Sequence, residues 1–237
     1  MSSSPAFFRP VQNIFRLSPL MAALAVFISP MTLVQANDSI EKEINTLEAP
    51  VQAPSYRFHQ DHILGTSLDV VITTANQQDA ETALQAIQTE IARLDQILSV
   101  WRDDSEISQL NRERQIAASS ELYDVIAACE QWRGVSCGGF DARLGQLIAL
   151  WEQSNDVQSL DANTQESLLR QLQTQSIELN PKTKQIKIDS AVKIAPDAYA
   201  KGYVIDRALM AAKQAVPHLQ GILVDIGGDM RVWGQSP

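Results

Sequence analysis

The sequence predicts a protein of the α+β class, in which antiparallel sheets are flanked by helices. Several long segments carry an apolar residue every three or four positions, which is the periodicity of a helix with one buried face. Shorter segments alternate apolar and polar residues or form two runs around a tight turn, which is the pattern of antiparallel strands. The segments lack the regular spacing of βαβ units, so a parallel sheet is not expected.

Helices are expected wherever the three-to-four periodicity continues over several turns. These segments are residues 77–100, a short helix after residue 105, residues 120–133, the part of 138–151 that follows its glycines, residues 163–174 and the segment that begins at residue 197. Asp104 or Ser105 is available as the N-cap of the short helix. Gly134 is expected to end the helix over 120–133.

Strands are expected in three places. Residues 62–74 alternate apolar and polar side chains, as a strand with one buried face does. Residues 176–189 form two runs around an Asn-Pro-Lys-Thr turn, and residues 221–234 form two apolar runs around Gly227 and Gly228. Each of these two segments is therefore expected to be a hairpin.

The N-terminal segment has the features of a secretory signal peptide. Two arginines precede an apolar run over residues 17–34, and VQA at 34–36 forms a cleavage site of small residues. A retained membrane anchor is disfavoured, because Ser29 and Pro30 interrupt the run and the run is short for a membrane span. Residues 1–36 are therefore expected to be a cleavable leader.

The rest of the chain is expected to form a tether and one folded domain. Residues 37–58 carry charge, proline and few large apolar side chains, a composition typical of a flexible linker. Residues 59–237 hold the periodic segments and are long enough to bury a core without disulfides. Cys129 and Cys137 are eight positions apart, and this spacing leaves both a disulfide and two free thiols open.

The charge of the chain limits its partners. The formal net charge is −9 at pH 7, so nucleic acid is not an expected partner. An acidic protein that binds an anion must screen it with a local lysine or a metal ion. The three histidines, His59, His62 and His218, fit no spacing of metal ligands.

The segment DAYAKGYVID, residues 197–206, has the features of an anion site at a helix start. Free backbone amides at a helix N-terminus attract anions, and Lys201 lies one turn into the expected helix, where it reaches either Asp197 or a phosphate. Gly202 lowers helix stability, which indicates a close approach to the backbone. A surface ion pair beside a tolerated glycine is the alternative interpretation.

Three further stretches could contact a ligand. DIGGD at 225–229 places two glycines at a strand end, where backbone amides can face a ligand, although a plain hairpin turn explains it equally well. CGGFD at 137–141 combines a flexible backbone, an aromatic ring and a carboxylate, or it is a helix-capping loop. Trp101 is available to stack on a planar ring or to pack in the core.

These stretches, in this order, resemble the FAD:protein FMN transferases, the ApbE-like flavin transferases of the bacterial cell envelope. The family's opening Met-Gly-Thr strand resembles ILGTSLDVVI, and its Leu-Ser-Thr-Tyr segment resembles LDQILSVWRDDSEISQLN. Its block with Phe-Asp, Gly-Pro-Leu and Leu-Trp is similar to GGFDARLGQLIALW. Its Lys-Gly-Tyr helix is similar to DAYAKGYVID, and its Gly-Gly turn is similar to ILVDIGGDMRVWG. The resemblance covers residues 62–234 and rests on order and spacing.

The resemblance implies an activity and a location. Similar proteins split the pyrophosphate of FAD with the help of Mg²⁺, pass FMN to a threonine hydroxyl of an acceptor flavoprotein and release AMP. The acceptor is expected to be a subunit of a membrane electron-transport complex, and the protein is expected to be periplasmic. An FAD pyrophosphatase that uses water as the acceptor, and a carrier that binds FAD without cleaving it, are the alternatives.

The resemblance also implies flavin contacts. The family's first flavin contact falls on Leu64, where methionine is usual, and its ring-stacking tyrosine falls on Trp101. Its flavin-binding triplet falls on Gly139, Phe140 and Asp141.

The remaining implied contacts lie at the phosphate end of FAD. They fall on Ala195 and on Lys201, the predicted catalytic residue, and a backbone carbonyl ligand for Mg²⁺ falls on Ala198. Many relatives carry aspartate at the position of Ala195, and Asp197 is the candidate replacement. Family members continue with further Mg²⁺-binding segments that do not occur before Pro237, so the chain is expected to be incomplete at its C-terminal end and weak or inactive alone.

Overall fold

The computed structural model describes residues 53–153, 162–190 and 192–235. All of these residues belong to one folded unit that begins at residue 52. The expected leader, and the expected tether as far as residue 52, lie outside the described residues. Within the described ranges, no helix is long and apolar enough to cross a membrane.

The larger sheet has four antiparallel strands in the order β1-β2-β6-β7. Their bounds are Ser55–Ile63 for β1, Thr66–Thr73 for β2, Gly221–Ile226 for β6 and Asp229–Gly234 for β7. The two central strands place Val70 opposite Val224 and Ile72 opposite Ile222, and all four side chains are buried. Burial of these aliphatic side chains fixes the register, because a slip by one residue would turn them toward water.

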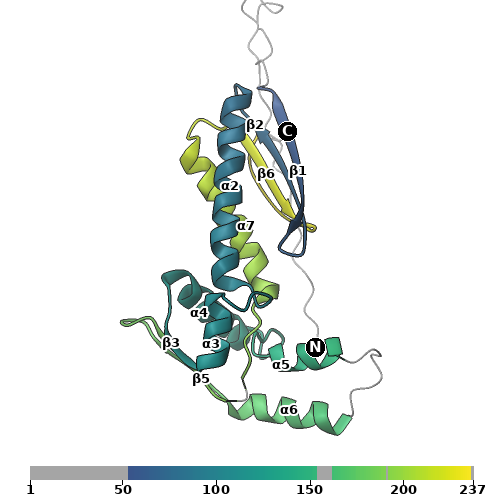
Figure 1. Ribbon diagram of the computed structural model, residues 1–237, viewed down its shortest axis with the longest axis vertical. Helices are drawn as coiled ribbons and strands as arrows, with labels where there is room; N and C mark the ends of the chain where they lie inside the picture. Colours follow the sequence, from purple (N-terminus) through teal and green to yellow (C-terminus); the bar gives the residue numbers. More distant parts are fainter. Residues whose placement is uncertain (1–52, 154–161, 191, 236–237) are drawn as a thin grey trace, which may run out of the picture. The chain divides into compact units, whose positions relative to one another are not determined.

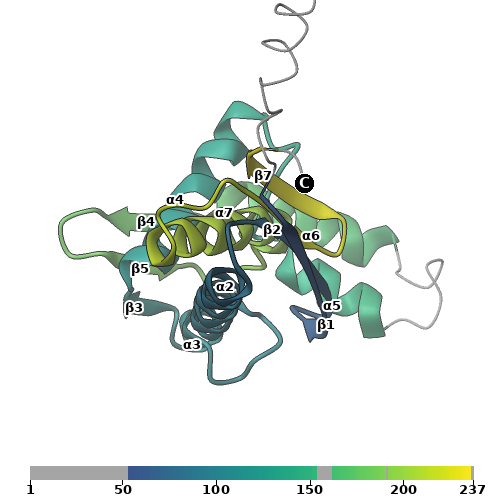
Figure 2. The same ribbon diagram turned by 90° about the horizontal axis from the view of Figure 1, so that it is seen from above.

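Two long helices pack against each other and against this sheet. Helix α2 covers Gln77–Leu98 and helix α7 covers Asp197–Ala215, and the two lie side by side next to the strands (Figure 1, Figure 2). Asn76 caps α2 by accepting a hydrogen bond from the backbone N–H of Asp79 at 2.9 Å. The buried face of α2 repeats at helical spacing and consists of Ala80, Ala83, Ile87, Ile91, Leu94 and Leu98.

A smaller sheet and four helices follow the C-terminal end of α2 (Figure 1). The sheet has the order β3-β5-β4, with β3 at Gln115–Ala117, β5 at Gln185–Ile188 and β4 at Ile177–Asn180. The helices are α3 at Glu106–Glu113, α4 at Ser120–Val135, α5 at Gly145–Gln153 and α6 at Ala162–Thr174. One hydrophobic cluster runs through both sheets, α2, α3, α4 and α7.

The sequence predictions of helices and hairpins are confirmed, with four differences. Residues 62–74, expected as one strand, contain the end of β1, a turn at Leu64 and Gly65, and the whole of β2. Strand β1 starts at Ser55, so residues 55–58, expected at the end of the tether, are strand. The three-residue strand β3 was not expected. Helix α4 continues past Gly134 to Val135, and the chain turns at Cys137 and Gly138, whose φ angles are 51° and 84°.

The two cysteines are free thiols. Cys129 is buried in the core and Cys137 is exposed. Burial raises the pKa of the Cys129 thiol to about 12, so this side chain behaves as a small apolar group.

Candidate functional site

A cavity of about 380 Å³ lies where the β1–β2 turn, the end of α2, the loop over residues 99–105 and the first turns of α7 meet. We call it the α2–α7 cavity. Its lining residues are His62, Leu64, Gly65, Leu94, Asp95, Leu98, Ser99, Trp101, Arg102, Asp197, Ala200, Lys201 and Val204. Three of the predicted site residues, Leu64, Trp101 and Lys201, therefore line one cavity although they come from segments far apart in the sequence.

The β1–β2 turn contributes a backbone in an unusual conformation. His62, Leu64 and Gly65 all have positive φ angles, of 62°, 49° and 77°. This region costs roughly 1–2 kcal/mol for a side chain such as leucine, so the surrounding structure must hold the turn. Leu64 is half-buried and packs against the hydrophobic core, which is one such restraint.

The Gly227–Gly228 turn restrains the same corner. Both glycines have positive φ angles, as a two-residue hairpin turn between β6 and β7 requires. A Cβ atom at Gly227 would lie 2.7 Å from the side chain of Thr66. The double glycine is therefore a hairpin turn that also permits close packing on the β1–β2 turn.

The loop over residues 99–105 presents Trp101 to solvent. The indole is 76% exposed, whereas Ser105 at the end of the loop is fully buried. The Ser105 hydroxyl donates to the carbonyl of Ser99 at 2.6 Å, with the carbonyl of Arg102 as a second acceptor at 3.0 Å. Its oxygen accepts the backbone N–H of Ser108 and caps α3. One hydroxyl thus fixes both the loop and the helix that follows it.

Lys201 enters the cavity from the second turn of α7. Pro196 is the N-cap of this helix, and no side-chain hydrogen bond caps it. The Lys201 ammonium lies 3.5 Å from the carboxylate of Asp229 at the start of β7. A Cβ atom added to Gly202 would have open space around it, so none of the described residues outside its own helix turn requires a glycine there.

The predicted triplet Gly139–Asp141 lies in the loop before α5 and does not line the α2–α7 cavity. Both carboxylate oxygens of Asp141 accept hydrogen bonds from the buried guanidinium of Arg143, at 2.8 and 2.6 Å. Burial alone would raise the pKa of Asp141, but the hydrogen bonds and charge of Arg143 outweigh it, so the pKa lies below its usual value. The Asp141 carboxylate is therefore ionised and held by Arg143.

Ala195 and Ala198 flank the start of α7. The backbone N–H of Ala195 donates to the carbonyl of Ala142 at 2.8 Å, which places this position beside the Gly139–Asp141 loop. Ala198 is exposed on the first turn. Neither alanine lines the α2–α7 cavity.

The described residues do not fit a magnesium site at Ala198. The side chain offers no oxygen, and across the described ranges no group of three His, Cys, Asp or Glu residues is arranged to hold a metal. A single carbonyl is insufficient, because Mg²⁺ prefers six oxygen ligands that include at least one carboxylate.

Comparison with known proteins gives a consistent result. The model of the ApbE family matches residues 64–237. The chain is 27% identical over 164 residues to the FAD:protein FMN transferase of Chlamydia trachomatis serovar D, covering 65% of this chain and 51% of that protein. It is 27% identical over 192 residues to the FAD:protein FMN transferase of Vibrio cholerae serotype O1, covering 74% and 55%. The chain thus spans about half the length of these relatives.

Two solved structures share the fold. The apbe protein of Thermotoga maritima superposes with a TM-score of 0.64 at 25% identity, covering 76% of this chain and 59% of that one. The apo form of the Pseudomonas stutzeri flavinyl transferase ApbE gives 0.66 at 22% identity, covering 80% and 64%. The expected α+β fold, with antiparallel sheets and flanking helices, is therefore confirmed.

Proposed function

The chain belongs to the ApbE family, and from this membership we propose that the whole protein transfers FMN from FAD to a threonine side chain of a target flavoprotein. In this reaction the threonine oxygen attacks the phosphorus of the FMN half. The bond from that phosphorus to the bridging oxygen of the pyrophosphate breaks, and AMP leaves with the bridging oxygen. The hydroxyl proton passes to the released phosphate or to water.

One observation carries the proposal: Leu64, Trp101 and Lys201 line the same cavity. An exposed indole offers a face on which a flavin ring can stack, and Leu64 adds an apolar contact. Lys201 brings a cation to the same cavity, where a phosphate attached to that ring would lie. Phosphoryl transfer is accelerated mainly by positioning and by neutralising charge, which a lysine beside a stacking surface supplies.

The position of Lys201 supports a proposal that its ion-pair partner changes when FAD binds. The ammonium of Lys201 faces the carboxylate of Asp229 at 3.5 Å, and both groups are partly exposed. A pair of this kind contributes little, so a phosphate can replace the carboxylate at low cost. We infer that Asp229 keeps Lys201 directed across the opening of the cavity until FAD binds.

The contacts predicted at Gly139, Phe140, Asp141, Ala195 and Ala198 stay predictions. These positions lie around the start of α7 and the loop next to it, and Asp141 is already engaged by Arg143. Bound Mg²⁺ would supply further neutralisation of the pyrophosphate. Because the described residues do not complete a site for it, we derive no step of the reaction through the ion.

A second candidate is an FAD pyrophosphatase that forms free FMN and AMP. The observation that favours it is the 76% exposure of Trp101, because a stacking residue open to solvent excludes water poorly. The acceptor would then be water in place of threonine.

Two proposals concern the setting of the reaction. The leader predicted for residues 1–36 supports a periplasmic location. The acceptor is proposed to be a threonine-bearing subunit of a membrane electron-transport complex.

The test is to incubate the full-length gene product with FAD, Mg²⁺ and a threonine-containing acceptor domain and to measure the intact mass of the acceptor. We expect a gain of one FMN, lost on addition of EDTA. The variant Lys201→Ala is expected to lower the rate by about 100-fold, on the order of the loss of one preorganised charged donor. Lys182→Ala, in the exposed turn between β4 and β5, is the matched control and should react normally.

Results other than a gain of one FMN would indicate a different function for the protein. Free FMN without a modified acceptor would establish the pyrophosphatase. Intact FAD after long incubation would leave only a flavin-binding protein. Normal transfer by Lys201→Ala would contradict the role of this lysine.

A further inference from the structure

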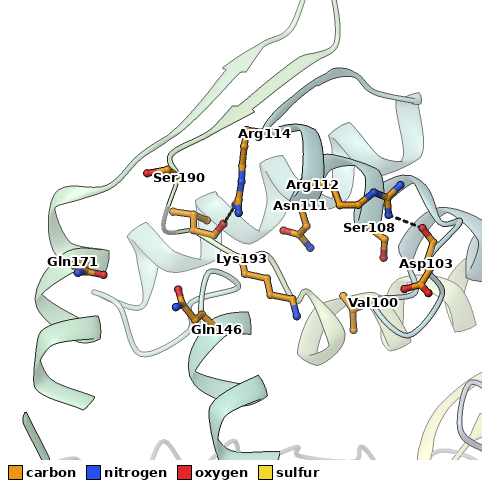
Figure 3. Close-up of a pocket in the computed structure, with 11 residues that line it drawn as sticks. Val100, Asp103, Ser108, Asn111, Arg112, Arg114, Gln146, Gln171, Ser190 and Lys193 are labelled. Carbon is orange, nitrogen blue, oxygen red and sulfur yellow. Dashed lines mark hydrogen bonds between the residues drawn. The ribbon is translucent and has the colours of Figure 1, made fainter. Parts of the chain in front are cut away.

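A second cavity, of about 560 Å³, lies beside the first and is formed by a different set of side chains (Figure 3). It is bounded by α3, the start of α5, α6 and the residues Ser190, Val192 and Lys193. The loop over residues 99–105 contributes to both cavities, with Val100 and Asp103 lining this one. We call it the basic cavity. Its residues are Val100, Asp103, Ser108, Asn111, Arg112, Arg114, Gln146, Gln171, Ser190, Val192 and Lys193.

The basic cavity contains cations that lack carboxylate partners. Most lysines and arginines in the described ranges form an ion pair, but Arg112, Arg114 and Lys193 form none with any described residue. Asp103 is the single acidic residue among those that line the cavity. In a chain whose net charge is −9, this local excess of positive charge is unusual.

The two arginines are held in place by backbone carbonyls. Arg112 donates to the carbonyl of Asp103 at 2.6 Å, and Arg114 donates to the carbonyl of Val192 (Figure 3). Arg114 is also the C-cap of α3, with a φ angle of 69°, so its backbone position is fixed by the end of the helix. Each guanidinium keeps further N–H groups for a ligand, since only one of its donors is used in this way.

The third cation, Lys193, lies in a segment whose backbone forms hydrogen bonds with residues on two sides. The side-chain amide of Asn111 donates to the carbonyl of Ile194 at 2.9 Å, and its oxygen accepts the backbone N–H of Ile194 at 2.8 Å. The N–H of Gly145 donates to the carbonyl of Lys193 at 3.0 Å. A Cβ atom at position 145 would lie 2.7 Å from that carbonyl oxygen, so the contact requires glycine.

The side chain of Lys193 points into the basic cavity. Its amine extends into the space between Gln146 and Val100 (Figure 3). Within the described part of the chain, no residue forms an ion pair with it. The ammonium of Lys193 is therefore directed into the cavity that also contains the guanidinium groups of Arg112 and Arg114.

We propose that the basic cavity binds a small phosphate monoester or inorganic phosphate. Three cations and one carboxylate leave an excess of two positive charges, which matches the dianion that a phosphate monoester forms near neutral pH. Arginine forks bind phosphate oxygens in pairs, and lysine adds a point charge. Gln146, Gln171 and Ser190 line the rest of the cavity, where the organic part of a monoester would lie. None of its residues lines the α2–α7 cavity, so we propose it as a site separate from the one that holds Trp101 and Lys201.

The experiment is isothermal titration calorimetry of the whole protein with inorganic phosphate and, separately, with ribose 5-phosphate. Sodium chloride keeps the ionic strength constant. We expect saturable binding, weakened about tenfold or more in Arg112→Gln and in Lys193→Gln, because each removes a charge-assisted hydrogen bond. Lys182→Gln, an exposed lysine outside both cavities, is the matched control and should bind as the parent does.

The two ligands distinguish the two sources of the anion. Tighter binding of ribose 5-phosphate supports a monoester, and equal binding of both supports inorganic phosphate. The proposal is overturned if neither ligand gives heat above that of sodium chloride, or if Lys193→Gln and Arg112→Gln bind normally. It is also overturned if Lys201→Gln abolishes phosphate binding or if FAD competes with phosphate, because the anion would then occupy the α2–α7 cavity.

Circular dichroism of each variant checks that the fold is retained. Lys193 is exposed, and its hydrogen bond to Gly145 is made by its backbone carbonyl, so its replacement by glutamine is not expected to disturb the structure. Loss of phosphate binding in Lys193→Gln with an unchanged spectrum is therefore attributable to the missing charge.

Discussion

The two cavities differ in how the protein holds their cations. In the α2–α7 cavity, Lys201 faces the carboxylate of Asp229, and the walls include an exposed indole and apolar side chains. In the basic cavity, Arg112 and Arg114 are bound only by carbonyl oxygens, which fix a guanidinium without neutralising it. The first arrangement suits a ligand that has both a flat apolar ring and a negative charge. The second arrangement suits a small anion.

The loop over residues 99–105 is the element that the two cavities share, and its loss should affect both. Ser105→Ala removes the hydroxyl that binds the carbonyls of Ser99 and Arg102 and caps α3. We expect the free energy of unfolding to fall by about 1–2 kcal/mol, the usual cost of an N-cap together with a buried hydrogen bond. FAD and phosphate should both bind more weakly, which titrations with each ligand would measure.

The matched control for this change is Ser120→Ala. Ser120 is exposed at the start of α4, and its side chain makes no hydrogen bond with a described residue. Unfolding in urea should leave this variant close to the parent protein. If Ser105→Ala weakens the binding of only one ligand, the two cavities do not depend on the loop equally.

A change confined to one side of the loop should separate the cavities. Trp101→Ala removes the exposed indole from the α2–α7 cavity. The affinity for FAD should fall by a factor of about 2 to 12, equivalent to the 0.5–1.5 kcal/mol of an aromatic stacking pair. Phosphate binding should stay unchanged. Trp132→Ala, which removes an indole that is 53% exposed and lines neither cavity, is the control.

The smallest expected effect is a dependence of the free energy of unfolding on pH, caused by Asp141 near the basic cavity. Hydrogen bonds between Asp141 and Arg143 hold the chain just before Gly145, whose N–H donates to the carbonyl of Lys193. The pKa of Asp141 is lowered in the folded protein from its ordinary value of 3.8, so its stabilising contribution is present above pH 3.8 and is lost as the pH falls through the folded pKa.

Urea unfolding at a series of pH values measures this contribution. The free energy of unfolding of the parent protein should fall more steeply below pH 3.8 than that of Asp141→Asn, because asparagine does not titrate and takes up no proton as the pH falls. Parallel curves for the two proteins would show that Asp141 does not titrate differently in the folded and unfolded states.

Much of the fold is predictable from the sequence because its signals are local. Helix α2 repeats apolar residues over six turns, and the strands β6 and β7 are separated by a two-glycine turn. Strand β1 lacks such a signal, because only Tyr56 and Phe58 alternate before a run of histidine, glutamine and aspartate. It becomes a strand through pairing with β2, which is a tertiary effect.

The candidate site is predictable in part for the same reason. Leu64, Trp101 and Lys201 lie within recognisable motifs, and the fold brings them together. The partner of Lys201 on β7 and the engagement of Asp141 by Arg143 depend on distances that no local pattern encodes. The basic cavity is harder still, because Asn111 and Ile194, which shape it, are 83 positions apart.

The position of Trp101 on the shared loop also has a spectroscopic consequence. The chain has four tryptophans, and this one is both highly exposed and adjacent to Val100, which lines the other cavity. In a variant that retains only Trp101, its fluorescence would report on both sides of the loop at once. A flavin stacked on the indole would quench the emission, whereas a colourless phosphate behind the loop would shift it without absorbing the light.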